Sequence, residues 1–335
     1  MKPLSIIVLH GASGDDPDER DTRDTAEAIR AALSRQGFDA RLAHVSGLPA
    51  TLPWAVKDRP GLVFNMVEAI DRDMQRAAEV LPLLEEVGIP YTGCSAAAQL
   101  AALSKTAQKS LMSRHGLPTP TWPQSGPALA KLGRVIVKSV TEHASLGIDA
   151  QSVVSGAHAT EEIVSREARF GGRFFAEEYI PGREFNLSLL ECREGVKMLP
   201  AAEILFQDFT SDAPRIVDYA AKWDETAHSY HHTPRRFTFP DSDNALLDQL
   251  ADLARRTWQV FGLSGYARVD FRVDEDGRPW ILEVNTNPCL APDAGFAAAA
   301  EQAGMGYDAL IAHLAALPLA AAEKDPRHVP HPQDC

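Results

Sequence analysis

The sequence is short of positive charge and of cysteine. Its 335 residues include 33 lysines and arginines against 46 aspartates and glutamates, for a formal net charge of −13 at pH 7. Because such a chain repels nucleic acid at long range, we expect no nucleic-acid partner, and local cations must hold any anionic ligand. The four cysteines (Cys94, Cys192, Cys289 and Cys335) lie far apart without Cys-x-x-Cys spacing. This argues against a zinc site or a disulfide framework and favours a reducing, cytoplasmic location.

Long apolar runs and the common nucleotide-binding motifs are also missing. No stretch approaches the ~20 apolar residues of a membrane span, and the N-terminus lacks a signal-peptide core, so we expect no membrane partner. The first glycine loop, His10-Gly-Ala-Ser-Gly14, is not Gly-x-Gly-x-x-Gly, and no Walker A sequence occurs. Neither a dinucleotide fingerprint nor a P-loop is therefore predicted.

The N-terminal third shows an alternation of strand-like and helix-like stretches. Apolar runs at residues 4–9 and 61–64 alternate with helix-like stretches near residues 21–36 and 75–87. This succession predicts a small parallel sheet. The whole length is more than one hydrophobic core usually serves, so two or three domains are expected.

A hairpin pattern lies near the C-terminus. Two alternating runs, residues 268–273 and 280–285, flank the turn-forming cluster at residues 274–277. Because strand side chains alternate, the even-numbered polar residues of the first run share one face and its odd-numbered apolar residues share the other. On the second run the same rule places Trp280, Leu282 and Val284 on one face and Ile281, Glu283 and Asn285 on the other.

The predicted register brings polar side chains together. If Asp274 pairs with Pro279, Asp270 lies opposite Glu283 and Arg268 lies opposite Asn285. Facing carboxylates destabilise a hairpin unless a cation lies between them, and Mg²⁺ prefers such oxygen ligands together with phosphate oxygens. We therefore predict a metal site at Asp270, Glu283 and Asn285, with phosphoryl chemistry beside Arg268. The alternative is an ordinary solvated hairpin face.

The same residues carry a family resemblance. Arg268-Val-Asp-Phe and Leu282-Glu-Val-Asn-Thr-Asn-Pro288 resemble the metal-binding end of ATP-grasp ligases, most closely of D-alanine:D-alanine ligases. The resemblance covers roughly residues 1–316. It implies an α+β/α/β chain with an ATP-grasp fold behind a small parallel-sheet domain. The implied divisions are an N-terminal domain at 1–100 and ATP-grasp subdomains at 101–182 and 183–317. The prolines after residue 317 predict a disordered tail at 318–335.

The resemblance implies three lysines that neutralise the triphosphate of ATP. Lys105 matches the family's first phosphate lysine. Lys138 ends an apolar strand-like run, so its ammonium lies at a sheet edge where it can meet a phosphate. Lys222, in Asp218-Tyr-Ala-Ala-Lys-Trp223, matches the lysine of a loop that closes over the triphosphate.

The segment at residues 174–184 resembles the family's nucleotide hinge. Glu177 and the main chain at Tyr179 and Ile180 match the positions that receive adenine. Glu184 matches the position that receives the ribose. An ordinary edge strand rich in acids is the alternative for this segment taken alone.

The chemistry that the resemblance implies is ATP-dependent joining of a carboxylate to an amine through an acyl phosphate. The implied cofactors are ATP and Mg²⁺, as two ions, with Mn²⁺ as a substitute. Arg268 would stabilise the oxyanion, and Ser145 belongs to a phosphate-covering loop at residues 141–147. Glu19 is the best match to the family's first-substrate glutamate. The partners implied are a small-molecule acid and amine, and a homodimer remains open.

The substrate half departs from the family pattern. After the second predicted strand, residues 65–73 lack the family's His-Gly and Gly-Glu-Asp-Gly pattern. Cys289 and Pro292-Asp293 replace the glycine and serine region that receives the carboxylate of the incoming D-alanine. We therefore expect an amine that lacks a carboxylate near Asp293, or one that bears a second cation. The alternatives are a D-alanine:D-alanine ligase proper, an ATP-grasp kinase, and a non-catalytic nucleotide-binding module.

Overall fold

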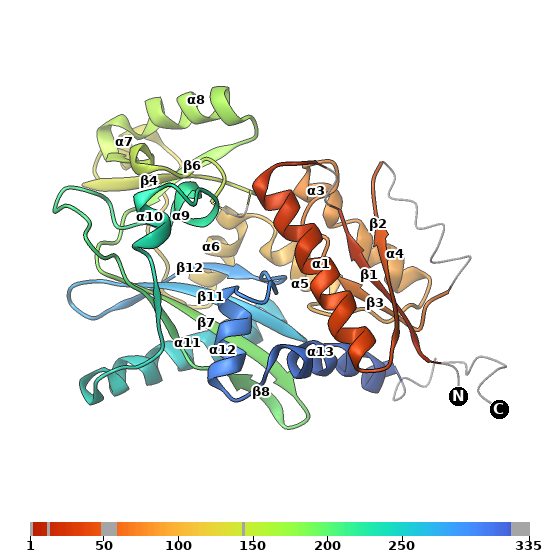
Figure 1. Ribbon diagram of the computed structural model, residues 1–335. Helices are drawn as coiled ribbons and strands as arrows, with labels where there is room; N and C mark the ends of the chain where they lie inside the picture. Colours follow the sequence, from red (N-terminus) through yellow and green to blue (C-terminus); the bar gives the residue numbers. More distant parts are fainter. Residues whose placement is uncertain (1–2, 12–13, 48–58, 143–144, 323–335) are drawn as a thin grey trace.

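The computed structural model describes residues 3–11, 14–47, 59–142 and 145–322, and three sheets organise this part of the chain (Figure 1). The first sheet is parallel and the other two are antiparallel. The predicted combination of a small parallel sheet with further α+β structure is therefore confirmed.

The N-terminal sheet has the order β2 (Asp39–His44), β1 (Ser5–His10), β3 (Leu62–Asn65). The two predicted apolar runs form its β1 and β3, and both strands are almost wholly buried. Helix α1 (Pro17–Arg35) joins β1 to β2. It begins at Pro17, before the predicted start, because the fixed φ of proline suits the first helical turn.

After β3 the chain forms two short helices where the sequence predicts one. These are α3 (Met74–Ala77) and α4 (Val80–Glu86). Asp73 caps α3, because its side chain accepts hydrogen bonds from the main-chain N–H groups of Gln75 and Arg76. The loop between β3 and α3 begins at the carboxyl edge of the parallel sheet, because β3 runs parallel to β1 and ends there at Asn65. Ligands of such sheets usually bind at this edge.

The second sheet has the order β5 (Val153–Ser155), β4 (Arg134–Ser139), β6 (Phe174–Glu178). Helix α8 (Ala159–Phe170) packs on β4 and β6 around a small core. Three one-turn helices complete this region: α7 (Gly126–Leu129), η1 (Ala150–Ser152) and η2 (Gly156–His158).

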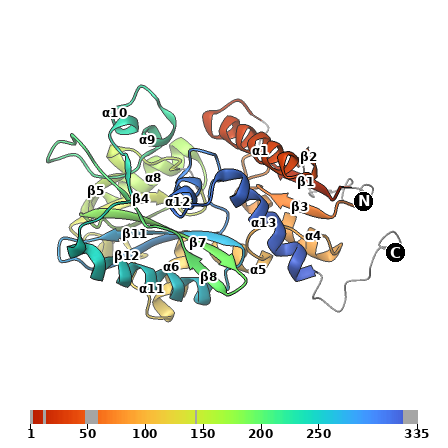
Figure 2. The same ribbon diagram turned by 60° about the horizontal axis from the view of Figure 1, so that its bottom comes forward.

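The third and largest sheet carries the predicted hairpin. Its order is β10 (Arg235–Arg236), β9 (Ala202–Ile204), β7 (Arg183–Cys192), β11 (Tyr266–Val273), β12 (Pro279–Asn285), with β8 (Gly195–Met198) paired to β7. Helix α11 (Asn244–Phe261) covers one face, as Figure 2 shows. The short α9 (Tyr219–Trp223), α10 (His228–His231) and η3 (Asp241–Asp243) lie between β9 and α11 in the chain.

Helices α5 (Ala96–Ala102) and α6 (Lys105–Arg114) connect the first sheet to the second. Both contribute buried residues to the core between α11 and the β11–β12 hairpin. The chain from α6 therefore lies against the third sheet before it enters the second one. The predicted domain boundaries at residues 100 and 182 stay predictions.

The last two helices return to the N-terminal sheet. Helices α12 (Gly295–Gln302) and α13 (Tyr307–Ala322) share a core cluster with β1, and α13 lies along α1 (Figures 1 and 2). Because α13 continues through Pro318 to Ala322, the predicted disordered tail from residue 318 is wrong for its first five residues. The rest of that tail, 323–335, lies outside the described residues.

Within the described ranges, no single helix is both long and apolar enough to cross a membrane. Taken together, α12 and residues 307–321 have the length and composition of a membrane span, but a 102° bend separates the two helices.

Candidate active site

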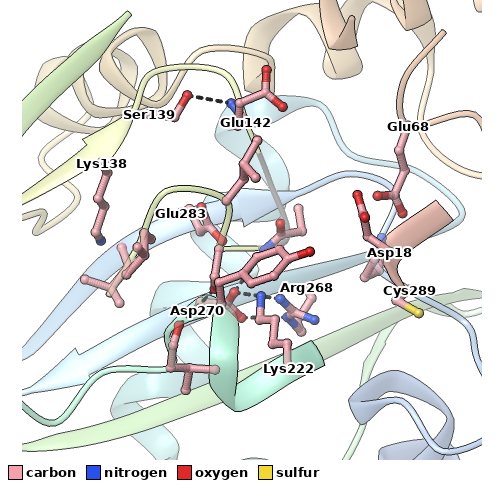
Figure 3. A pocket seen from close by; sticks show the side chains of 18 of the residues that line it. Asp18, Glu68, Lys138, Ser139, Glu142, Lys222, Arg268, Asp270, Glu283 and Cys289 are labelled. Carbon is pink, nitrogen blue, oxygen red and sulfur yellow. Dashed lines mark hydrogen bonds and ion pairs between the residues drawn. The ribbon is translucent and has the colours of Figure 1, made fainter. Parts of the chain in front are cut away.

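A cleft of about 1110 Å³ lies where the three sheets meet, and Figure 3 shows part of it. All of the site residues predicted from the sequence line it: Glu19, Lys105, Lys138, Ser145, Glu177, Tyr179, Ile180, Glu184, Lys222, Arg268, Asp270, Glu283 and Asn285. Residues that are far apart in the chain are thus brought to one cavity.

The hairpin register at the cleft is as predicted. Asp270 pairs with Glu283 and Arg268 with Asn285. Beyond Asp270 the register shifts by one residue, so Val273 pairs with Pro279, and the predicted pairing of Asp274 with Pro279 is wrong. The strand irregularity is a β-bulge, which adds one residue to β12.

The bulge also changes which residues of β12 face the core. Ile281 and Val284 are both fully buried in the core under α11, whereas Leu282 and Glu283 both line the cleft. The predicted faces are therefore wrong for Ile281 and Leu282 and right for Glu283, Val284 and Asn285. On β11 the prediction holds, since Val269, Phe271 and Val273 are buried in that core.

Asp270 is held by hydrogen bonds from three side chains. Arg268 donates to both carboxylate oxygens, from Nε at 2.7 Å and from Nη2 at 2.9 Å. Asn285 donates to Oδ2 at 3.0 Å, and Asn186 of β7 donates to Oδ1 at 2.8 Å. The predicted patch of carboxylates, amide and guanidinium therefore forms, and Asn186 adds to it.

Glu283 lies opposite a lysine from another element. The Nζ atom of Lys105, at the start of α6, is 3.6 Å from Oε2 of Glu283, and it donates to the carbonyl of Glu142 at 2.5 Å. Lys105 is buried, although it is the first residue of a helix. Its ammonium therefore stands at the predicted metal patch, as a phosphate lysine would.

Lys222 faces the same patch from α9, as Figure 3 shows. Within the described chain, its ammonium makes no hydrogen bond or ion pair. The Lys222 side chain is exposed to solvent within the cleft, but the cleft walls surround it. This partial removal from water is the largest cause that lowers the pKa of Lys222, and repulsion from Arg268 is the second. A phosphate group would relieve this repulsion between the two cations.

A buried ion-pair triad lies deeper in the cleft. Glu177 accepts from Lys138 Nζ at 2.6 Å and forms an ion pair with Lys109, and the Glu177 side chain is 1% exposed. Burial alone would raise the pKa of Glu177, but the two lysines hold it below its ordinary value. Lys109 also donates to the Thr119 hydroxyl at 3.0 Å. The carboxylate predicted to meet adenine is thus fixed and charged.

The predicted hinge residues follow β6. The N–H of Tyr179 donates to the carbonyl of Arg134 at 3.0 Å, so that donor is already used and the prediction for the Tyr179 main chain is corrected to its carbonyl alone. The hydrogen bonds described within this part of the chain leave the main chain of Ile180 without a partner. Glu184 lies 3.6 Å from Arg272 Nε, and burial raises the pKa of its carboxyl group.

Ser145 and Glu19 line the cleft but do not contact one another. The Ser145 hydroxyl donates to the carbonyl of Val217 at 2.9 Å, and this residue has a φ of +61°. Glu19 lies against Gly14, and its Oε2 is buried with no hydrogen-bond partner among the described residues. Neither side chain therefore contacts the other in a way that could relay a proton, and the unpaired oxygen of Glu19 is the one that lies against Gly14.

Further carboxylates line the substrate end of the cleft. Asp18 and Asp21 come from α1, and Glu68 comes from the loop after β3 (Figure 3 labels Asp18 and Glu68). Burial, followed by the charge of Asp21, raises the pKa of Glu68 to about 7, although water in the cleft reaches its side chain. In the described part of the chain, none of the three carboxylates has a lysine or arginine partner.

The loop after β12 adds a thiol, a carboxylate and a nearby guanidinium. The Cys289 thiol donates to Asp21 at 3.6 Å. Burial raises the pKa of Cys289 to about 12, so the thiol is neutral. Arg235 donates from Nη1 to the main-chain carbonyl of Asp293 at 2.8 Å. The negative charge of Asp293 therefore has a cation close by, which the sequence did not reveal.

The donor set of the hairpin fits Mg²⁺. Among the described residues, no group of three or more His, Cys, Asp and Glu side chains could hold a metal ion. The hairpin offers two carboxylates and one amide, and Mg²⁺ commonly takes one or two carboxylates and completes its shell with phosphate oxygens and water. These hard oxygen ligands suit a metal that arrives with a nucleotide.

Comparison with known proteins places the chain in a family. A family model described as the C-terminus of D-Ala–D-Ala ligase matches residues 130–316. The D-alanine–D-alanine ligase of Chromohalobacter salexigens is 32% identical over 295 residues, which cover 85% of this chain and 84% of that protein. The chain belongs to the D-alanine–D-alanine ligase family. A relative with the same name from Gloeobacter violaceus is 30% identical and covers 92% of this chain and 97% of its own length.

Solved structures agree on the fold. The D-alanine–D-alanine ligase of Bacillus anthracis has a TM-score of 0.72 at 20% identity, over 96% of this chain and 98% of that chain. Its complex with ATP has the same TM-score at 18% identity. The predicted ATP-grasp fold is therefore confirmed, and the chain is an ATP-dependent ligase that forms C–N bonds.

Proposed function

We propose that this ligase activates a small-molecule acid as an acyl phosphate and then joins it to an amine. The observation that carries the proposal is the patch of Asp270, Glu283 and Asn285, with Arg268 and Lys222 beside it, in a cleft large enough for a nucleotide and two small substrates. The alternative of a kinase ending at a phosphorylated product gains no support from the site.

The residues divide between the nucleotide and the reacting groups. Glu177 and the segment at 179–180 would receive adenine, and Glu184 the ribose. Three lysines would neutralise the triphosphate: Lys105, Lys138 and Lys222.

Asp270, Glu283 and Asn285 would hold Mg²⁺, as two ions and replaceable by Mn²⁺. The metal, when bound, supplies charge stabilisation for the transferring phosphoryl group. Arg268 would stabilise the oxyanion at the acyl centre.

We propose that the amine substrate differs from D-alanine by carrying a second cation. The sequence predicted either an amine without a carboxylate near Asp293 or an amine with a second cation. The first alternative is less well supported, because Arg235 lies close enough to offset the negative charge of Asp293. The second alternative gains support from Asp18, Asp21 and Glu68, which face the cleft without cationic partners in the described chain.

Two broader proposals accompany this one. We propose a cytoplasmic location, which the free thiols of Cys94, Cys192 and Cys289 support. We also propose a homodimer, which sedimentation of the purified chain would test.

The decisive experiment measures ADP release with pooled acids and amines, together with mass analysis of the products. We expect ADP and an amide in equal amounts with at least one diamino compound or basic amino acid. Efficient formation of D-alanyl-D-alanine from D-alanine, with no gain from a second amino group, would contradict the proposal of altered substrates. ATP binding without ADP release in any pool would contradict the ligase mechanism itself.

A further inference from the structure

The reaction requires the removal of protons from the amine substrate. An amine reaches the site largely as an ammonium ion, R′NH₃⁺, and only its neutral form has a lone pair to attack the acyl carbon. As the new C–N bond forms and the bond from that carbon to phosphate oxygen breaks, the nitrogen loses two protons in all. One goes to the leaving phosphate, which departs as HPO₄²⁻. The other needs a base.

The hydroxyl of Ser145 and the carboxylate of Glu19 are poorly placed for this task. The Ser145 hydroxyl is directed to the carbonyl of Val217, and Glu19 lies against Gly14. Cys289 is no better, because its raised pKa leaves it a neutral thiol that donates to Asp21. The base must therefore come from another part of the cleft wall.

Glu68 has the position that the task requires. It follows β3 at the carboxyl edge of the parallel sheet and projects into the cleft, as Figure 3 shows. Its carboxylate makes no hydrogen bond or ion pair with the described residues. It lies close enough to Arg268 and Lys222, on the opposite wall, for their charges to act on it. A substrate between these walls would have the acyl phosphate on the cationic side and Glu68 on the other.

The surroundings of Glu68 determine its proton affinity. Burial and the charges of Asp21 and Asp18 on α1 raise its pKa to about 7, against the opposing effect of Lys222 on α9 and Arg268 on β11. The other titratable groups that interact with it are Tyr266 of β11 and Cys289. Both have raised pKa values and are neutral near pH 7. A carboxylate with this affinity can accept a proton at neutral pH and release it to water afterwards.

We propose that Glu68 is the general base that takes the proton from the amine substrate. The proposal rests on the acyl-phosphate function proposed above and adds a catalytic residue to it. Asp18 and Asp21 attract the ammonium ion to the same place and leave the proton transfer to Glu68. After proton transfer, the neutral amine attacks the acyl carbon, and Glu68 returns its proton to solvent.

The test separates activation of the acid from attack by the amine. Wild type, Glu68→Gln and Glu68→Asp are assayed with ATP and the acid from the panel above, D-alanine first. One series uses hydroxylamine, which is largely unprotonated at neutral pH and traps the acyl phosphate as a hydroxamate. The other series uses the panel amine at saturation. The matched control is Glu79→Gln, an exposed glutamate outside the cleft.

We expect Glu68→Gln to lower amide formation at pH 7 by roughly 100-fold or more, with hydroxamate formation within about threefold of wild type. Glu68→Asp should recover part of the amide rate. The deficit should shrink as pH rises and more of the amine arrives neutral. Wild type should lose rate as pH falls through about 7 and level off above it, whereas the rate of Glu68→Gln should keep rising up to the pKa of the amine, with no break near pH 7.

Two results would overturn the role of Glu68. One is an equal loss of hydroxamate and amide, which indicates a role in folding or in binding the acid. The other is a raised amine KM with an unchanged kcat and pH limb, which indicates binding of the ammonium ion alone. If wild type yields no hydroxamate with any acid of the pool, the acyl-phosphate mechanism fails, and Glu68 loses its role with it.

Discussion

The buried triad of Lys109, Glu177 and Lys138 allows a sharp test of how the nucleotide end is held. Replacing Lys109 by methionine keeps most of its alkyl stem and removes one of the two cations that contact Glu177. Breaking a buried ion pair by deleting one partner costs 3–5 kcal/mol in typical cases, and Lys138 remains as a second partner. We therefore expect Lys109→Met to lower the free energy of unfolding by about 3 kcal/mol.

Urea unfolding at pH 7, followed by tryptophan fluorescence, measures this loss. The control is Lys131→Met, an exposed lysine, which should change stability by less than ~0.5 kcal/mol. The double variant Lys109→Met/Glu177→Gln also removes the carboxylate that pairs with Lys138, so it should be less stable than Lys109→Met alone. A loss below ~1 kcal/mol for Lys109→Met, or a double variant at least as stable as Lys109→Met, would refute the reasoning.

The pH dependence supplies a second check. In wild type the pKa of Glu177 is below its ordinary value of 4.5, so its ion pairs contribute stability above that pH, and this contribution is lost as pH falls through the folded pKa. With one lysine removed, burial should raise the pKa of Glu177 in the folded variant. Acid should then destabilise Lys109→Met less than wild type, and the difference between them should shrink below about pH 4.5.

Three further predictions concern the hairpin and the lysines. Glu283→Gln should lower turnover by roughly 100-fold at saturating Mg²⁺, with thermal unfolding near wild type; retention of most activity would exclude it as a metal ligand. Lys222→Ala and Lys138→Ala should each raise the apparent ATP constant about tenfold, and Lys222→Ala should also lower the maximal rate; unchanged constants in both would contradict their phosphate contacts. Gln108→Leu should cost about 2–4 kcal/mol in urea unfolding, because it leaves two buried main-chain groups of Val284 unsatisfied; a loss below ~1 kcal/mol would contradict this.

The sequence predicted those parts of the site whose residues are close together in the chain. Strand periodicity and a short turn were enough to place Asp270 opposite Glu283, because the register near the cleft depends on local alternation. The predicted pairing at the turn end of the hairpin was wrong, because one extra residue in β12 forms a bulge and shifts the register there. Nothing in the alternation of residues 279–285 distinguishes the two registers.

Other features were hidden for different reasons. Lys109 carried a usable signal, since it follows Lys105 by four residues on α6 and so shares its face. Strand β2 is mostly exposed and mixes polar with apolar residues, so no continuous apolar run indicated it. The gathering of Asp21, Glu68 and Cys289 depends on contacts among three distant segments, and residue spacing carries no information on such contacts.

The bulged strand also explains how Lys105, the proposed phosphate lysine, is held near the proposed metal ligand Glu283. The outer edge of β12 is closed by α6 and the segment after it, without a further strand. Gln108 of α6, fully buried, accepts from the N–H of Val284 at 2.8 Å and donates to its carbonyl at 3.2 Å. The N–H of Ile281, on the other side of the bulge, donates to the carbonyl of Pro118 at 2.8 Å.

These bonds satisfy the main-chain groups that an edge strand would otherwise leave unpaired in a buried place. They also fix α6 to Val284, which lies between Glu283 and Asn285 in the strand. Lys105, one turn before Gln108, is thereby held 3.6 Å from Glu283. Gln108, which takes no part in the proposed reaction, thus holds the proposed phosphate lysine Lys105 near the proposed metal ligand Glu283, so substitutions at Gln108 should affect stability and catalysis together.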